Sequence, residues 1–132
     1  MQDIPDIDDL LAAARASVLR KLLPVLADTL HYEALMVANA LAIARRMLAH
    51  GEAMHCAEHT ALRRIYGLPA AAGGDAAGER VALEHRLAAD LRHGRFDPAS
   101  GRFEEVQALL WEDTVRKLRQ TSPKLLDENR GD

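Results

Sequence analysis

The sequence has little of what a β-fold, a disulfide scaffold or a membrane protein needs. The apolar β-branched residues that favour strands number 6 Val and 4 Ile, against 24 Ala and 20 Leu. A single cysteine, Cys56, excludes an internal disulfide framework and is typical of a reducing cytoplasm. The longest stretch without charge, residues 34–44, is too short to cross a bilayer core of about 30 Å. We therefore expect no membrane span.

Nothing in the first residues resembles a secretory signal, and the charge balance does not favour nucleic acid. The chain starts MQDIPDIDD, which has neither a basic nor an apolar segment, so we expect a cytoplasmic location. A net charge of −3 argues against a protein that binds nucleic acid through phosphate contacts. With 132 residues, 48% of them hydrophobic, the chain can form a core, and we expect one domain over residues 1–132.

What the sequence does have is helical periodicity, because Ala and Leu are strong helix formers. The spacing predicts five helices, over about residues 7–22, 28–50, 52–66, 79–93 and 102–120. Gly51, Gly67 and Gly94 follow three of them and can supply the left-handed residue that ends a helix. We expect a flexible loop over residues 70–78 and a frayed tail over residues 127–132. Such helices with short connections predict an all-α antiparallel bundle.

The predicted helix over residues 28–50 is apolar on two sides. One stripe holds Leu30, Ala34, Val37, Leu41, Ala44 and Leu48, and a nearly opposite stripe holds Tyr32, Met36, Ile43 and Met47. A helix of this kind is buried twice, in the centre of a bundle or between its own bundle and a partner. The second stripe therefore predicts a homodimer interface, with the bundle's own interior as the open alternative.

Polar side chains on this helix suggest two further roles. A lone amide in an apolar helix, here Asn39, often fixes the register of a helical interface. Arg45 lies near the expected end of the helix, where a cation is favoured and where it could bind an anion. Asn39, Arg45 and Trp111 are the candidates for a polar pocket, although a solvated face is the simpler interpretation.

The motifs that carry chemistry are weak. His55-Cys-Ala-Glu-His59 matches the H-x-x-E-H string of inverted zinc metalloproteases, and histidines at i and i+4 can share a zinc ion. The chain is too small for a peptide cleft and marks no further acidic ligand, so a helix flank without metal is the preferred interpretation. No phosphate-binding glycine loop and no E-x-x-E magnesium cluster is present. We expect no cofactor and assign no catalytic residue.

Three segments resemble a small bacterial helical family, domain-of-unknown-function family 6285. They are VANALAIARRMLAHG (Val37–Gly51), LRHGRFD (Leu91–Asp97) and VRKL with the following SP (Val115–Pro123). With the leucine-rich first helix, the resemblance covers most of residues 7–126. It implies an accessory role in acyl-CoA metabolism, beside acyl-CoA dehydrogenases and kinase-like proteins similar to aminoglycoside phosphotransferases. It gives no catalytic residue to carry over.

Together these observations favour a small helical interaction or accessory module that forms a homodimer and has no catalysis of its own. The alternative is a helical bundle that binds a small ligand or acts as an enzyme, with an acyl-CoA or a nucleotide as the ligand. The two differ in whether the apolar stripe or a polar pocket carries the function.

Overall fold

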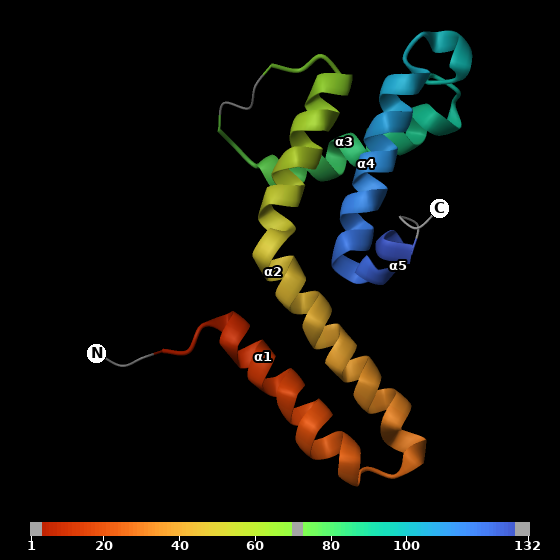
Figure 1. Ribbon diagram of the computed structural model, residues 1–132. Helices are drawn as coiled ribbons and strands as arrows, with labels where there is room; N and C mark the ends of the chain where they lie inside the picture. The colour runs from red at the N-terminus through yellow and green to blue at the C-terminus, as the bar shows by residue number, and fades with distance from the viewer. Residues whose placement is uncertain (1–3, 70–72, 129–132) are drawn as a thin grey trace. The chain divides into compact units, whose positions relative to one another are not determined.

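All regular structure is helical in the computed structural model, which describes residues 4–69 and 73–128 (Figure 1). The α-helices of this part are α1 (Ile7–Ser17), α2 (His31–Ile65), α3 (Ala76–Arg92), α4 (Phe103–Thr121) and α5 (Pro123–Glu128). A π-helical turn (Val18–Leu22) and 3-10 turns (Leu23–Val25, Asp28–Leu30 and Pro98–Ser100) complete the helical structure. The all-α class predicted from composition is confirmed. None of the described helices is long and apolar enough to span a membrane.

Helix α2 replaces two of the predicted helices. We expected a break at Gly51, but α2 continues through it without a positive φ and ends at Ile65. A glycine inside a helix costs only about 1 kcal/mol relative to alanine, and no proline follows it here. Glu52, Ala53 and Met54 are good helix formers, so propagation outweighs the glycine.

The expected helix ends at Gly67 and Gly94 are confirmed. Both glycines have positive φ, 61° and 72°, which suits a residue just past a helix end. Leu68 N–H donates to the Arg63 carbonyl at 2.9 Å, and Arg95 N–H donates to the Asp90 carbonyl at 3.0 Å. These six-residue closures are Schellman motifs, which satisfy carbonyls that the helix leaves open.

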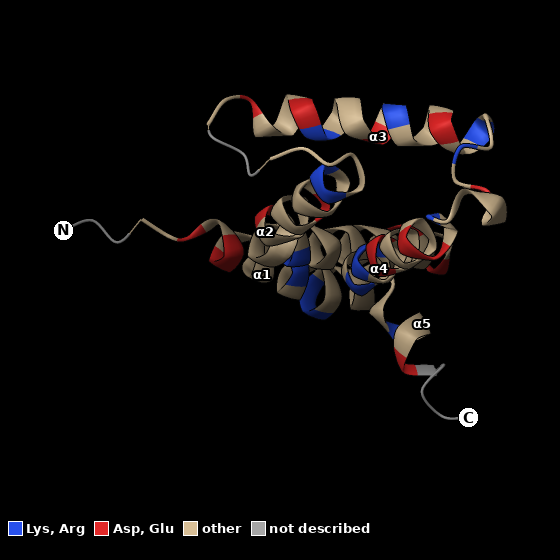
Figure 2. Cartoon of the chain, turned by 90° about the horizontal axis from the view of Figure 1, so that it is seen from above, with Lys and Arg blue, Asp and Glu red and all other residues tan. Residues whose placement is uncertain are grey.

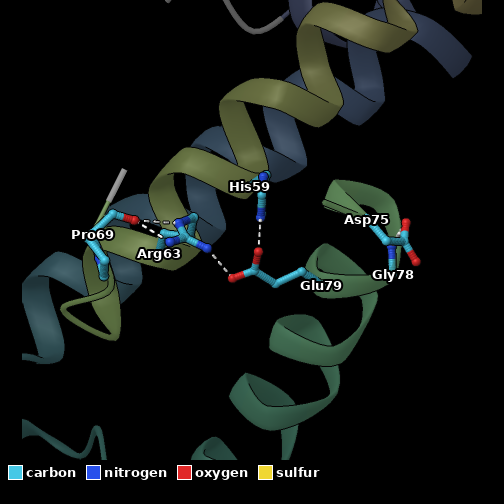
Figure 3. Close-up of polar contacts among 6 residues, drawn as sticks. All are labelled: His59, Arg63, Pro69, Asp75, Gly78 and Glu79. Carbon is cyan, nitrogen blue, oxygen red and sulfur yellow. Dashed lines mark hydrogen bonds and ion pairs between the residues drawn. The ribbon is translucent and has the colours of Figure 1, made fainter. Parts of the chain in front are cut away.

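Helix α3 begins earlier than expected, inside the predicted loop over residues 70–78. The Asp75 side chain accepts from Gly78 N–H at 3.0 Å and caps the first turn, so residues 76–78 are helical (Figure 3). At the other end, α5 takes in Asp127 and Glu128, which we expected to be frayed. The rest of these two predictions, on residues 70–72 and 129–132, lies outside the described residues.

The chain divides into two units, residues 1–52 and 53–132, and α2 takes part in both. The expectation of a single domain over residues 1–132 stays a prediction.

The first unit is a helical hairpin in which α1 runs back along α2 (Figure 1). Leu26 is extended and its carbonyl lies 3.0 Å from His31 Nε2, which fixes the turn between the two helices. Far from this turn, Arg45 binds Asp8 and holds the open end of the hairpin. Among the described residues of the unit only Ala34 and Ala38 are buried, so the hairpin has no large buried side chain.

The second unit holds the hydrophobic core. Its buried side chains come from the end of α2 (Leu62, Ile65), from α3 (Leu83, Leu87), from the following loop (Phe96) and from α4 (Val106). Tyr66 and Leu109 pack against this cluster. The i and i+4 leucines that predicted the buried side of α3 are confirmed, because Leu83 and Leu87 are 6% and 5% exposed.

We expect Val106→Ala to lower the free energy of unfolding by about 2 kcal/mol, since it removes two buried methyl groups and leaves a cavity. The matched control is Val81→Ala on α3, where the side chain is 41% exposed against 2% at Val106. The control should stay within about 0.5 kcal/mol of wild type. Urea denaturation followed by circular dichroism measures both. Equal losses would contradict a core at Val106.

Candidate functional site

The side of α2 that faces away from α1 carries the predicted interface. Tyr32, Met36, Ile43 and Met47 lie within about 60° of one another around the helix, and we call them the outer face. Tyr32, Met36 and Met47 are 69%, 47% and 52% exposed, and Ile43 is half-buried. The opposite side, with Ala34 and Ala38, is buried. The outer face is therefore an accessible apolar surface, and its role as an interface stays a prediction.

The stripe that we expected to be buried by the other helices is covered only in part. Leu30, Val37 and Leu48 are 47%, 50% and 53% exposed, and Leu35 on the other flank is 50% exposed. The reason is that α1 alone covers this part of α2 within the first unit, and one helix covers only a narrow side of another. The sequence pattern shows which residues are apolar but not how much of that surface a neighbour covers.

Helix α1 also leaves part of its apolar surface uncovered. Ile7 and Leu10 are 59% and 54% exposed, whereas Leu11 is half-buried. Asp8, in the first turn, is also half-buried because it pairs with Arg45. The ion pair spans 37 positions of the chain, so no local sequence signal could have found it.

Asp8 and Arg45 form a two-pronged ion pair. Arg45 Nε donates to Asp8 Oδ1 at 2.8 Å, and its Nη2 donates to Asp8 Oδ2 at 3.0 Å. The hydrogen bond from Arg45 holds the pKa of the Asp8 carboxyl below its usual range. The planar guanidinium matches a carboxylate in this geometry, which makes the pair directional. Arg45 thus anchors α1 on α2.

The three residues of the predicted polar pocket belong to different units. Asn39, exposed on α2, and Arg45 lie in the first, and Trp111 lies on α4 in the second. Trp111 is 70% exposed and lines a surface cavity of about 460 Å³, together with Glu104, Gln107, Ala108, Leu110 and Thr114. Arg45 already has a carboxylate partner, so the pocket of Asn39, Arg45 and Trp111 stays a prediction.

His55 and His59, the weak metal candidates, have different surroundings. His55 is exposed, whereas His59 is buried and its Nε2 lies 3.2 Å from Glu79 Oε2 on α3 (Figure 3). Glu79 also accepts from Arg63, which in turn donates to the Pro69 carbonyl. Within the described residues, no three His, Cys, Asp or Glu side chains gather in a group that could hold a metal ion. His59 therefore joins α2 to α3, and Cys56 beside it is exposed.

A second polar cluster joins α2, α3 and α4 inside the second unit. Glu58 is 6% exposed and accepts from Arg80 Nη1 at 3.2 Å, while Arg80 also binds Glu84. On α4, Lys117 Nζ lies 2.6 Å from Asp113 Oδ2. Burial, with a hydrogen bond that the protonated Glu58 carboxyl donates to Glu84 and with the charge of Asp113, raises the pKa of Glu58 above its usual range. Acidic and basic residues alternate along α3 (Figure 2), which supplies Arg80 and Glu84.

We expect Glu58→Gln to flatten the pH dependence of stability. A carboxyl whose pKa is raised on folding holds more protons when folded, so stability falls as pH rises from the unfolded pKa through the folded pKa. Gln keeps an oxygen for Arg80 but does not titrate. Urea denaturation from about pH 4 to about pH 7 should therefore show that the free energy of unfolding of the variant increases relative to that of wild type as pH rises. Glu52→Gln, at an exposed position of α2, is the control. A parallel pH profile for Glu58→Gln and wild type would contradict the assignment.

Comparison with known proteins gives a family and no closer relative. Neither a curated protein nor a solved structure is significantly similar to the chain. The model of the family described as "Domain of unknown function (DUF6285)" matches residues 24–125. This range contains all of α2, α3 and α4, and also the three segments whose sequence resembles that family. The chain belongs to the DUF6285 family.

Proposed function

We propose that this protein is a small helical interaction module that forms a homodimer through the outer face of α2 and has no catalysis of its own. One observation carries the proposal. Within the first unit α1 covers one side of α2, and the opposite side leaves Tyr32, Met36 and Met47 exposed by about half or more. Contiguous apolar patches of this kind on a soluble domain mark interaction sites.

Energetics favour a partner on this surface. Burying a side chain such as Met contributes roughly 1.5–3 kcal/mol relative to leaving it exposed. The hairpin by itself buries only Ala34 and Ala38, and two helices alone bury too little apolar surface for an independent core. A second hairpin packed on the outer face would complete a four-helix arrangement, which is a stable solution for amphipathic helices.

A second copy of the chain is the partner that the chemistry of the outer face fits best. Residues 34–44, which include Met36 and Ile43, carry no charge, so this central part of the outer face can meet its counterpart across a two-fold axis without like-charge repulsion. Asn39 lies between Met36 and Ile43 and is exposed. An amide donates and accepts hydrogen bonds, so Asn39 can pair with the same residue of a second copy and fix the register.

The family resemblance adds a proposal about context. It implies an accessory role in acyl-CoA metabolism, with an acyl-CoA dehydrogenase or a kinase-like protein as the partner. The single cysteine supports a cytoplasmic location. The alternative function, a bundle that binds an acyl-CoA or a nucleotide or acts as an enzyme, would use the polar candidates Asn39, Arg45 and Trp111 rather than the apolar side chains of the outer face. Substitutions on the outer face therefore distinguish an interaction function from a ligand function.

We expect the double substitution Met36→Glu/Met47→Glu to give a folded monomer. Each copy would place two carboxylates in an apolar interface, and burying an unpaired charge is strongly unfavourable. The dimer dissociation constant should rise at least about 100-fold, or about 3 kcal/mol. Light scattering after gel filtration measures the mass, and circular dichroism checks that the helices persist.

The matched control is Val81→Glu/Ala88→Glu, which adds the same charge at exposed positions of α3 in the second unit. It should remain a dimer. A monomeric wild type, or a dimer that survives both charges on the outer face, would disprove the proposed interface.

A separate prediction concerns Asn39. If its amide sets the register of the dimer, Asn39→Leu should bind a second copy at least as tightly but lose a unique assembly, since apolar contact alone tolerates several registers. Sedimentation velocity should then show species larger than a dimer. Ala40→Leu, at the next exposed position, is the control and should leave a single dimer. If Asn39→Leu instead sediments as a single dimeric species, Asn39 does not set the register.

A further inference from the structure

Four arginines line one surface cavity of the second unit. The cavity has a volume of about 420 Å³ and lies where the end of α2 and the end of α3 meet the segment before α4. Its lining includes Arg64, Tyr66, Arg86, Asp90, Arg95 and Arg102. Cavities of about 300–1,000 Å³ are typical of small-molecule sites.

The buried Asp90 contacts several of the side chains that line the cavity. It is 7% exposed and accepts from the Tyr66 hydroxyl at 2.8 Å. Arg95 Nη1 lies 3.4 Å from its Oδ1, and Arg86 Nε lies 3.9 Å from its Oδ2. Burial and the hydrogen bond to Asp90 raise the pKa of Tyr66 to about 12, so the hydroxyl stays protonated and keeps donating. One carboxylate therefore orients a phenol and two guanidinium groups.

Aromatic rings hold two of the guanidinium groups by their faces. The Arg86 guanidinium lies 4.0 Å from the centre of the Tyr66 ring, and that of Arg102 lies 5.8 Å from the centre of the Phe96 ring. A cation–π contact leaves the N–H groups of a guanidinium able to donate, and Arg102 already donates from Nε and Nη2 to Glu105. The Arg95 and Arg86 side chains are 68% and 55% exposed, so a ligand can reach their donors.

The charges of the cavity are unbalanced. Arg102 pairs with Glu105, and Asp90 serves both Arg86 and Arg95. Arg64 is exposed and has no ion-pair partner among the residues that the structure describes. Four arginines and one aspartate thus line a cavity in a chain whose net charge is −3. Such a local reversal of sign concentrates anions at the cavity.

We propose that this cavity binds the phosphate group of a small phosphorylated molecule. A phosphate offers three oxygens and about two negative charges, enough to accept from several guanidinium groups at once. A carboxylate has two oxygens and a single negative charge, so it offers fewer acceptors and less charge to the same arginines. The site lies within the second unit, so it does not depend on the dimer formed through the outer face.

Calorimetric titration of the full chain with inorganic pyrophosphate tests the proposal at constant ionic strength. Arg64→Gln/Arg95→Gln should weaken binding at least about tenfold, because it removes two charge-assisted donors. The control Arg92→Gln/Arg119→Gln removes the same charge from exposed arginines outside the cavity and should change binding within about twofold. Arg64→Gln alone disturbs no ion pair of the described residues, so its loss of affinity cannot be attributed to misfolding.

Two comparisons complete the experiment. Succinate should bind at least about tenfold more weakly than pyrophosphate, and Met36→Glu/Met47→Glu should bind pyrophosphate as wild type does. Absence of pyrophosphate binding, an equal loss in the Arg92→Gln/Arg119→Gln control, or succinate binding as tightly as pyrophosphate would each overturn the proposal. None of these results bears on whether the chain forms a dimer.

Discussion

The first unit depends on the fact that one helix can cover only one side of another. Helix α1 lies on the side of α2 that carries Ala34 and Ala38, where small side chains allow close approach, and the Asp8–Arg45 pair holds it there. Tyr32, Met36 and Met47, on the opposite side of α2, then remain exposed. The exposed outer face follows from this arrangement, because a two-helix hairpin has no third element to cover it. The proposed dimer would bury this exposed apolar surface.

In the second unit, helices pack on one another and bury a hydrophobic core without a partner. The end of α2, α3 and α4 enclose Leu62, Ile65, Leu83, Leu87 and Val106, so each helix contributes side chains to one buried core. Polar contacts then fix how these helices lie on one another: His59 and Arg63 reach Glu79, and Glu58 reaches Arg80. Buried ionic contacts of this kind add little net stability, but breaking one partner is costly, so they favour one arrangement over others. The arginine-lined cavity lies in the same unit, where the end of α2 and the end of α3 meet the segment before α4.

Several local features could be predicted from the sequence because they depend on neighbouring residues only. The ends of α2 and α3 at Gly67 and Gly94 follow from backbone conformations that glycine adopts without strain. The spacing of Leu83 and Leu87 gives the buried side of α3. Gly51 was misleading for the same local reason, since a glycine is compatible with both a helix end and a helix interior. The residues around it decide between the two.

The sequence by itself determined the helical class, most helix ends, the two-sided character of α2 and the family to which the chain belongs. Composition and spacing suffice for these, because helix formation is governed by contacts within a few residues. Only the tertiary structure decided which apolar stripes are covered, that Arg45 pairs with Asp8, and that Arg64, Arg86, Arg95 and Arg102 meet at one cavity. These depend on contacts between residues far apart in the chain, and the sequence around each residue does not indicate which distant residue it contacts.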